Sequence, residues 1–322
     1  MRRIPAVLAV SALAALTLAG CSSSGSASPD GCTRPASDGA AADLVTVSGD
    51  TDSAPEVDAY TPLKAKSTTF ADIETGTGAA ITEDGQLVVL DLTIVNGTDG
   101  ETLFQTAYDG SNAQVVPLSD WTGAVPGLGD ALECATEGSR VVAVIAPDDI
   151  DAGAASTIGL AEGDSAVAVV DVRKVYLPKA DGRDQFVEGR GLPTVVRAAD
   201  GTPGIMIPDA APPDEVVVQV LKKGDGEVVT GDDPVRVHYT GVTWAEKEVF
   251  DSSWGKEPVS LTVEGVVEGF GQALEGQTVG SQILVVIPPE AGYGDQAQGS
   301  IPANSTLVFV IDILGIDAAP AQ

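Results

Sequence analysis

The chain of 322 residues carries one pattern of residues twice, and this repeat limits the possible folds more than any other feature. Residues 127–133 read Gly-Leu-Gly-Asp-Ala-Leu-Glu, and residues 269–275 read Gly-Phe-Gly-Gln-Ala-Leu-Glu. The apolar runs that follow, 141–145 and 283–287, keep the same spacing. Because two copies are too few for a solenoid, the repeat predicts two tandem domains of one fold.

Strands dominate the expected secondary structure. The β-branched run 216–220, the alternating run 235–239 and the apolar run 307–313 are bounded by Gly and Pro, as strands commonly are. Each copy has one short segment with helical character, 126–133 and 268–275. Strands wrapped over a short helix predict the α+β class.

Changes in composition suggest the boundaries. Segments rich in Ser, Gly, Asp and Pro separate the two copies from each other and from the N-terminus, although 44–47 could form one strand. We expect a signal peptide (1–20), a flexible linker (21–66), a first domain (67–178), a linker with entry strands (179–213), a second domain (214–316) and a frayed tail (317–322).

The N-terminus has the features of an export signal. Arg2 and Arg3 precede an apolar run, 4–18, that is too short for a comfortable membrane span. The run ends in Leu-Ala-Gly-Cys at 18–21, which resembles the bacterial lipobox, where the cysteine receives lipid such as palmitate. The alternative is an ordinary secretory peptide with a coincidental Cys21. We expect an extracytoplasmic protein, anchored to a bacterial cell membrane through lipid on Cys21.

Two further cysteines, Cys32 and Cys134, remain if Cys21 carries lipid. An even pair in an exported protein permits a disulfide, which would attach the N-terminal segment to the first domain. Two free thiols are the alternative, because the sequence does not show that the two sulfur atoms meet.

The charge excludes several functions. Lys and Arg total 17 against 47 Asp and Glu, a formal net charge of −30. Such a surface disfavours nucleic acid and charge-driven attachment to anionic lipid. It is typical of a soluble secreted protein, with a cationic partner as the alternative.

His238 is the only histidine, so a hydrolase triad or a histidine-rich metal site is disfavoured, and the acidic residues do not form a calcium loop. We expect no metal and no cofactor.

The last third of the chain resembles the FKBP-type peptidyl-prolyl cis-trans isomerases. The resemblance rests on several short pieces in one order, none of them specific alone. These are 235–241 (Val-Arg-Val-His-Tyr-Thr-Gly), 250–253 (Phe-Asp-Ser-Ser), 269–270 (Gly-Phe), 273–276 (Ala-Leu-Glu-Gly), 285–289 (Val-Val-Ile-Pro-Pro), 292–294 (Gly-Tyr-Gly), 301–302 (Ile-Pro) and 306–309 (Thr-Leu-Val-Phe).

The resemblance implies an antiparallel half-barrel sheet around a short helix, and an apolar pocket in which an Xaa–Pro bond rotates. Asp251, held by Tyr239, would lie beside the rotating bond, and the Val267 amide and the Tyr293 hydroxyl would bind substrate carbonyls. The pocket itself would be formed by Tyr239, Phe250, Val266, Val267, Phe270, Ile301 and Phe309. Taken singly, the aromatic residues could be core, Asp251 a turn residue and Tyr293 an exposed loop residue.

The second copy departs from the family at the rim of the pocket. Ala291 replaces a frequent second aromatic residue, Val259 replaces another, the loop 295–300 is polar, and 254–258 is short. These departures affect efficiency, substrate preference and affinity for macrolide inhibitors more than the activity itself.

The first copy departs much further. Aligned on the sequence, Thr93 or Ile94 stands for Tyr239, Phe104 for Phe250, Gln105 for Asp251 and Leu128 for Phe270. We therefore expect an inactive or very weakly active first domain, which either binds extended clients or spaces the second domain from the membrane.

The sequence as a whole predicts a monomeric isomerase that assists the folding of exported, proline-containing proteins. One alternative is a non-catalytic peptide-binding chaperone, or holdase, that uses both domains as client surfaces. A solute-binding lipoprotein is a third hypothesis, but it requires two α/β lobes, which this strand-rich repeat does not predict.

Overall fold

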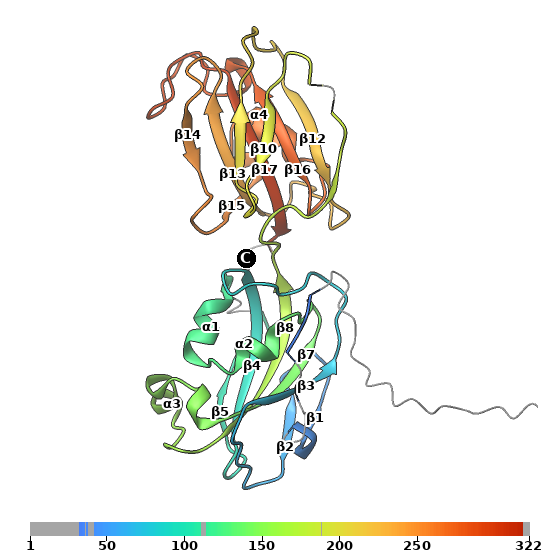
Figure 1. Ribbon diagram of the computed structural model, residues 1–322, viewed down its shortest axis with the longest axis vertical. Helices are drawn as coiled ribbons and strands as arrows, with labels where there is room; N and C mark the ends of the chain where they lie inside the picture. The colour runs from blue at the N-terminus through green and yellow to red at the C-terminus, as the bar shows by residue number, and fades with distance from the viewer. Residues whose placement is uncertain (1–31, 36, 38–41, 111–113, 188, 318–322) are drawn as a thin grey trace, which may run out of the picture.

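The computed structural model describes residues 32–35, 37, 42–110, 114–187 and 189–317. The expected signal peptide, Cys21 and the last five residues lie outside this part of the chain. Figure 1 shows two sheet-rich domains, one above the other along the long axis of the molecule. No helix in the described ranges is both long enough and apolar enough to cross a membrane.

The first domain is built on a six-stranded antiparallel sheet. Its strands lie in the order β3-β7-β8-β4-β5, and β6 pairs with β4 beside β5. The strands are β3 (Thr69–Glu74), β4 (Leu87–Asn96), β5 (Thr102–Gln105), β6 (Val116–Pro117), β7 (Arg140–Ile145) and β8 (Ala166–Val175), with helices α1 (Leu118–Ala124), α2 (Leu128–Leu132) and α3 (Ala152–Ile158) and the 3-10 turn η2 (Pro147–Asp149).

The second domain repeats this sheet. The order is β14-β13-β17-β16-β12-β9, with β15 beside β13, and all pairs are antiparallel. The elements are β9 (Arg183–Asp184), β12 (Val217–Lys223), β13 (Val235–Thr243), β14 (Val249–Ser252), β15 (Val259–Leu261), β16 (Gln282–Ile287), β17 (Leu307–Ile316), α4 (Glu268–Leu274), η3 (Val263–Gly265) and η4 (Pro289–Ala291). The predicted pair of tandem α+β domains is confirmed.

The expectation of one helix per domain is correct for the second domain and wrong for the first. α3 occupies the loop before β8, where the second domain has only η4. Asp151 explains its start, because its side chain accepts hydrogen bonds from the amides of Gly153 and Ala154, both at 2.9 Å. Gly159, at φ 80°, ends it in the left-handed conformation.

Each helix near the centre of a domain packs on the concave face of its sheet. α4 buries Phe270, Ala273 and Leu274, which are spaced three and four residues apart and so share one helical face. α2 buries Leu128, Ala131 and Leu132 in the same way. The strands beneath, β7 and β16, are buried at every residue, because the convex faces of both sheets are also covered.

A two-stranded hairpin covers each convex face. β1 (Val45–Ser48) pairs with β2 (Glu56–Ala59), after the 3-10 turn η1 (Ala42–Leu44), and packs on Val142, Val144 and Val167. β10 (Thr194–Arg197) pairs with β11 (Pro203–Met206) and packs on the second sheet. Residues 21–66 were expected to be a linker with one possible strand, and 179–213 a linker with entry strands. The described parts of both segments are largely packed structure, since the apolar convex faces need a cover.

In each domain, a buried polar side chain links the convex hairpin to the sheet. In the first domain, Arg140 Nε lies 2.7 Å from Asp171 Oδ1, and Arg140 Nη1 lies 2.6 Å from the Gly49 carbonyl in the β1–β2 turn. Burial raises the pKa of the Asp171 carboxyl, and the Arg140 guanidinium opposes this shift. The N-terminal segment is attached separately, since Cys32 and Cys134 form a disulfide.

In the second domain, the buried side chain that makes this link is the amide of Gln282 instead of a cation such as Arg140. Gln282 Nε2 donates to Asp312 Oδ1 at 2.6 Å, and Arg197 Nε of β10 donates to Gln282 Oε1 at 2.6 Å. Burial raises the pKa of the Asp312 carboxyl. The same place in the fold thus holds an ion pair in one domain and a mainly amide-mediated link in the other.

Candidate active site

Four aromatic rings meet between the sheet and helix α4 of the second domain. They come from β13 (Tyr239), β14 (Phe250), α4 (Phe270) and β17 (Phe309). Ring centroids are 5.1 Å apart for Phe270 and Phe309, 5.4 Å for Phe250 and Phe309, and 6.2 Å for Tyr239 and Phe270. All three pairs meet edge to face, the favoured geometry of aromatic contacts.

A glycine on β13 lets two of these rings approach the backbone. A Cβ at Gly241 would lie 2.5 Å from the Cζ atom of Phe250 and 2.8 Å from the Cε1 atom of Phe309. Both distances are shorter than real carbon contacts, so any side chain at 241 would displace the rings. Sequence reasoning included Gly241 in the resemblance but gave it no role.

The cluster is buried on one side and partly exposed on the other, and we call the partly exposed side its mouth. Phe270, Phe309 and Ile301 are buried, whereas Tyr239 and Phe250 are half-buried. Val266 and Val267, which precede α4, are half-buried and pack against the same cluster. Asp251 is exposed at the mouth, and Tyr293 in the loop after β16 is 37% exposed and does not belong to the buried cluster.

The polar side of the mouth is a tyrosine–aspartate pair. The Tyr239 hydroxyl donates a short hydrogen bond to Asp251 Oδ2, and the Ser252 amide donates to Asp251 Oδ1 at 2.8 Å. Burial, together with the nearby Asp251 carboxylate, raises the pKa of Tyr239. Tyr239 therefore remains a protonated donor at any physiological pH, and it fixes the direction of the carboxylate.

His238 supports this pair from the other face of β13. Its ring stacks on Trp254 at 4.5 Å, and its Nδ1 is hydrogen-bonded to Ser253 Oγ at 2.9 Å. The same Ser253 Oγ accepts the Tyr239 amide at 2.9 Å. Burial lowers the pKa of His238 to about 4, so its imidazole is neutral at pH 7. The structural role expected for His238 agrees with these contacts; the part played by Ser253 and Trp254 was not foreseen.

The site offers little conventional catalytic chemistry. Within the described ranges, no group of three His, Cys, Asp or Glu residues could hold a metal ion. The polar groups at the mouth described above are the Tyr239–Asp251 pair, the Ser252 amide and the Tyr293 hydroxyl, and His238 lies on the other face of the strand. Such an arrangement can accept an apolar ring and orient a carbonyl group, without a nucleophile.

The corresponding place in the first domain is filled with aliphatic side chains. Leu92 pairs with Val170 as Tyr239 pairs with Ile311, and the Leu92 amide donates to Thr106 Oγ1 at 3.1 Å as the Tyr239 amide donates to Ser253. In the same register, Leu103 stands at the place of Phe250, Phe104 at that of Asp251, and Ala168 at that of Phe309.

The sequence alignment of the first copy was therefore wrong by one or two residues. Neither Thr93 nor Ile94 stands where Tyr239 stands, and Phe104 and Gln105 do not correspond to Phe250 and Asp251. Phe104 is exposed, as Asp251 is, whereas Leu103 packs on the core, as Phe250 does. The substitution of Leu128 for Phe270 holds. No aromatic ring of the pocket survives among these positions.

Comparison with known proteins identifies relatives of the second domain. A family model described as FKBP-type peptidyl-prolyl cis-trans isomerase matches residues 225–314. The FKBP-type peptidyl-prolyl cis-trans isomerase FkpA of Escherichia coli (strain K12) is 41% identical over 106 residues, covering 33% of this chain and 39% of the relative. A probable FK506-binding protein of Corynebacterium glutamicum is 34% identical over 113 residues, covering 35% of this chain and 96% of the relative.

The match to the first of these relatives is partial, since the chain spans 39% of its length. The crystal structure of FkpA from Escherichia coli is 34% identical to the chain, with a TM-score of 0.31. That superposition covers 39% of this chain and 53% of the other.

Proposed function

The chain belongs to the FKBP-type peptidyl-prolyl cis-trans isomerases, and from this premise we propose that its second domain catalyses rotation about Xaa–Pro peptide bonds. The observation that carries the proposal is the convergence of four aromatic rings from four separate elements, with a fixed tyrosine–aspartate pair at the open side.

An apolar pocket suits this reaction. Rotation breaks the amide resonance, which gives a barrier of about 18–20 kcal/mol. An acceleration of about four powers of ten requires the transition state to be stabilised by about 5.5 kcal/mol. The twisted amide is less polar than the planar one, so transfer from water into the ring cluster favours the twisted form. Phe270 and Phe309 would form the floor under the prolyl ring.

The polar groups at the mouth would orient the substrate. Tyr239 holds the Asp251 carboxylate beside the open side of the cluster, where the rotating bond would lie. The backbone amide of Val267, at the residue before α4, would donate to one substrate carbonyl, and the exposed Tyr293 hydroxyl to another. Ile301 and Val266 would contact the flanking residues.

The clients we propose are unfolded, exported polypeptides that contain proline. The motif around Cys21 supports export and a lipid anchor on that residue, and we propose that the protein works as an anchored monomer at the outer face of a bacterial cell membrane. The anchor can be tested by Cys21→Ser, which should move the protein from the membrane fraction to the soluble one and prevent labelling with palmitate.

The activity is tested most directly with Phe250→Leu, which installs the residue that the first domain carries at the same place. In the full chain, this variant should lower the rate constant for cis-to-trans exchange of a proline tetrapeptide by about 10- to 100-fold, or about 1.4–2.7 kcal/mol. Phe186→Leu is the matched control, because Phe186 is 92% exposed on the same domain. Wild-type activity in the Phe250 variant would refute the pocket, and a wild type without activity would refute the function.

A further inference from the structure

An open groove of about 1190 Å³, which the isomerase site does not use, lies mainly on the first domain and extends to Glu227, Asp233, Ile316 and Asp317 of the second. The groove lies over the middle of β4, where residues 89–91 fall between two partner strands. β5 pairs with Thr93–Val95, and β6 pairs with Leu87 and Val88. The sheet edge therefore has a gap between β5 and β6, and the groove opens there.

One residue that lines the groove, Ala107, differs in size from its counterpart in the second domain. Thr106 bonds to strand β4 in the way that Ser253 bonds to β13, so Ala107 occupies the place of Trp254. Trp254 stacks on His238 in the second domain. A small residue at 107 leaves the corresponding space empty in the first domain.

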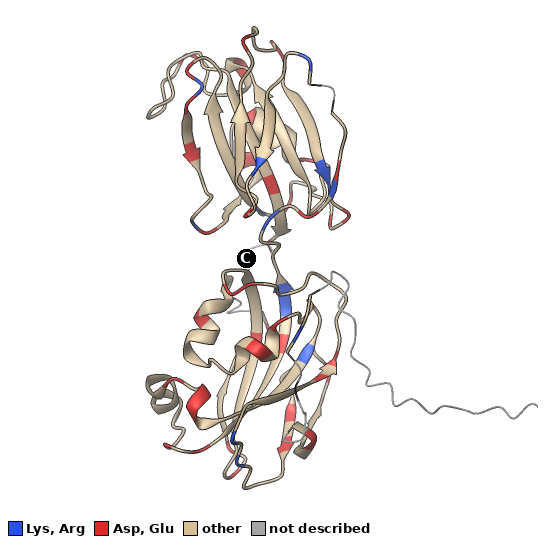
Figure 2. Ribbon diagram, in the orientation of Figure 1, with Lys and Arg blue, Asp and Glu red and all other residues tan. Residues whose placement is uncertain are grey.

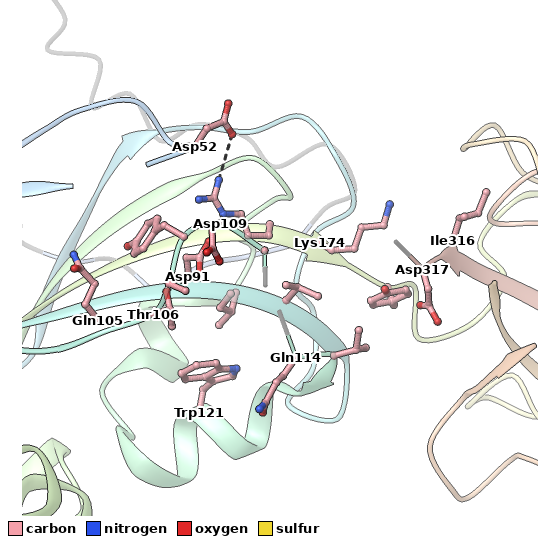
Figure 3. Close-up of a pocket in the computed structure, with 18 of the residues that line it drawn as sticks. Asp52, Asp91, Gln105, Thr106, Asp109, Gln114, Trp121, Lys174, Ile316 and Asp317 are labelled. Carbon is pink, nitrogen blue, oxygen red and sulfur yellow. Dashed lines mark hydrogen bonds and ion pairs between the residues drawn. The ribbon is translucent and has the colours of Figure 1, made fainter. Parts of the chain in front are cut away.

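The groove has aromatic walls. Phe104, at the free edge of β5, is 38% exposed. Trp121 of α1 lies across the groove from Asp91 and Asp109, as Figure 3 shows, and its indole N–H is buried without a hydrogen-bond partner in the described part of the chain. Tyr176 lies at the end that faces the second domain. These walls can bury an apolar side chain.

The groove is also acidic. Its lining includes two cations, and both are already paired: Arg173 Nε lies 2.6 Å from Asp91, and Lys174 Nζ lies 3.8 Å from Glu227. Acidic residues outnumber them, and Figure 2 shows the positions of Asp and Glu in red on both domains. The six acidic residues that line the groove are Asp52, Asp91, Asp109, Glu227, Asp233 and Asp317.

These features select one kind of occupant. Enclosed pockets for small molecules measure about 300–1,000 Å³, and this groove is larger and open. Its acidic lining repels nucleic acid and anionic lipid. An extended peptide can lie along a free sheet edge, and lysine or arginine side chains interact favourably with both carboxylates and aromatic faces.

We propose that the groove of the first domain binds an extended, lysine- or arginine-containing segment of an unfolded polypeptide. This site is separate from the isomerase pocket. The identification of that polypeptide as a client of the enzyme rests on the proposed function, but the binding itself does not.

The test uses the full chain and a fluorescein-labelled ten-residue peptide of alternating lysine and valine, with a glutamate–valine peptide as its counterpart. Neither peptide contains proline, so binding does not report on the isomerase pocket. Fluorescence anisotropy should show that the lysine peptide binds at least about tenfold more tightly. Its affinity should fall when about 1 M salt shortens the Debye length to about 3 Å.

Filling the groove gives the sharpest variant. Ala107→Trp copies the second domain and should weaken binding of the lysine peptide by at least about tenfold, the loss typical of a blocked hot spot. Exchange of a proline tetrapeptide should stay at the wild-type rate. Phe104→Ser, on an exposed side chain that a folded variant tolerates, should weaken binding several-fold, and Phe186→Ser should leave it unchanged.

Three results would overturn the proposal. Equal affinity for the two peptides would remove the charge argument, and wild-type affinity in both Ala107→Trp and Phe104→Ser would place the peptide elsewhere. Loss of binding in Phe250→Leu would place it in the isomerase pocket. Failure of the isomerase assay with peptide binding intact would instead refute the proposed function and leave the groove standing.

Discussion

The two domains share one backbone plan and differ in what occupies the concave side of the sheet. In the second domain, aromatic rings from four elements leave an open mouth; in the first, Leu92, Leu128 and Ala168 are buried and close the same space. A groove opens instead beside β4 at Ala107, where the second domain has Trp254 stacked on His238. A sheet of this type can therefore present a site in either place, depending on a few side chains.

The shared plan extends to the smallest details of the turns. The Gly76 amide donates to Ser139 Oγ at 2.9 Å, and the Gly224 amide donates to Ser281 Oγ at 3.0 Å. The turn after each helix also agrees, because Cys134 at φ 61° stands where Gly276 has φ 75°. In the first domain the left-handed position is thus occupied by the cysteine of the disulfide, although glycine would adopt this conformation at less cost.

The largest difference in stability between the two domains should come from Arg140 and Gln282, the buried side chains that link the convex hairpins to the sheets. Arg140→Ala should lower the unfolding free energy of the first domain by about 3–5 kcal/mol, because it leaves the Asp171 carboxylate buried without its cation. Gln282→Ala should cost the second domain less, about 1–3 kcal/mol, since the Ala180 amide still donates to Asp312 at 2.8 Å.

Native-state hydrogen exchange of the β7 and β16 amides measures the unfolding free energies of the first and the second domain separately. Arg197→Ala, which removes only the half-exposed outer partner of Gln282, is the control and should cost less than either. Equal losses of unfolding free energy for Arg140→Ala and Gln282→Ala would show that the ion pair and the amide link contribute equally. That result would contradict the expected difference between the two domains.

A pH-dependent difference should follow from His238, whose place in the first domain is taken by Asp91. The folded-state pKa of His238 is about 4, below the ordinary value of 6.5, because the ring is buried. The unfolded chain therefore binds a proton first, and the stability present above pH 6.5 is lost as the pH falls toward 4. The loss should reach about 3 kcal/mol in the second domain.

His238→Asn should remove this dependence while retaining a polar partner for Ser253. Urea unfolding at several pH values between 4 and 7, followed through hydrogen exchange of β16, gives the difference between wild type and variant. The first domain serves as the internal control. An identical slope in wild type and variant would mean that another group titrates in this range.

The sequence was sufficient for the features that depend on local spacing. The rings of the site were expected from the family resemblance, whereas the repeat and the positions of α2 and α4 follow from residues close together in the chain. The register of β4 does not, because its run 87–95 is apolar at both odd and even positions and one face cannot be told from the other. A shift of one residue exchanges the faces, which is why Phe104 was placed in the pocket.

The convex hairpins were predicted only in part, as one possible strand at 44–47 and as entry strands within 179–213, for a related reason. Each consists of two four-residue strands separated by Gly, Asp or Ser, which is also the composition of a linker. Their burial is decided by the apolar faces of β7 and β16, strands that lie far away in the sequence. Likewise, the correspondence of Ala107 to Trp254 appears only when β4 and β13 are aligned in register.

The smallest expected effect concerns the tyrosine at the mouth, where the first domain has Leu92. Tyr239→Phe keeps the ring in the aromatic cluster and removes only the hydroxyl that donates to Asp251. One hydrogen bond to a charged group contributes about 1.5–3 kcal/mol at most when buried, and the exposure of Asp251 reduces this, so the exchange rate should fall by about three- to tenfold. Tyr239→Leu removes the ring as well and should cost more. If Tyr239→Phe and Tyr239→Leu lost the same activity in the proline tetrapeptide assay, the hydroxyl alone would separate the two domains; if Tyr239→Phe were fully active, the rings would separate them, and the fixed carboxylate would have no part in the reaction.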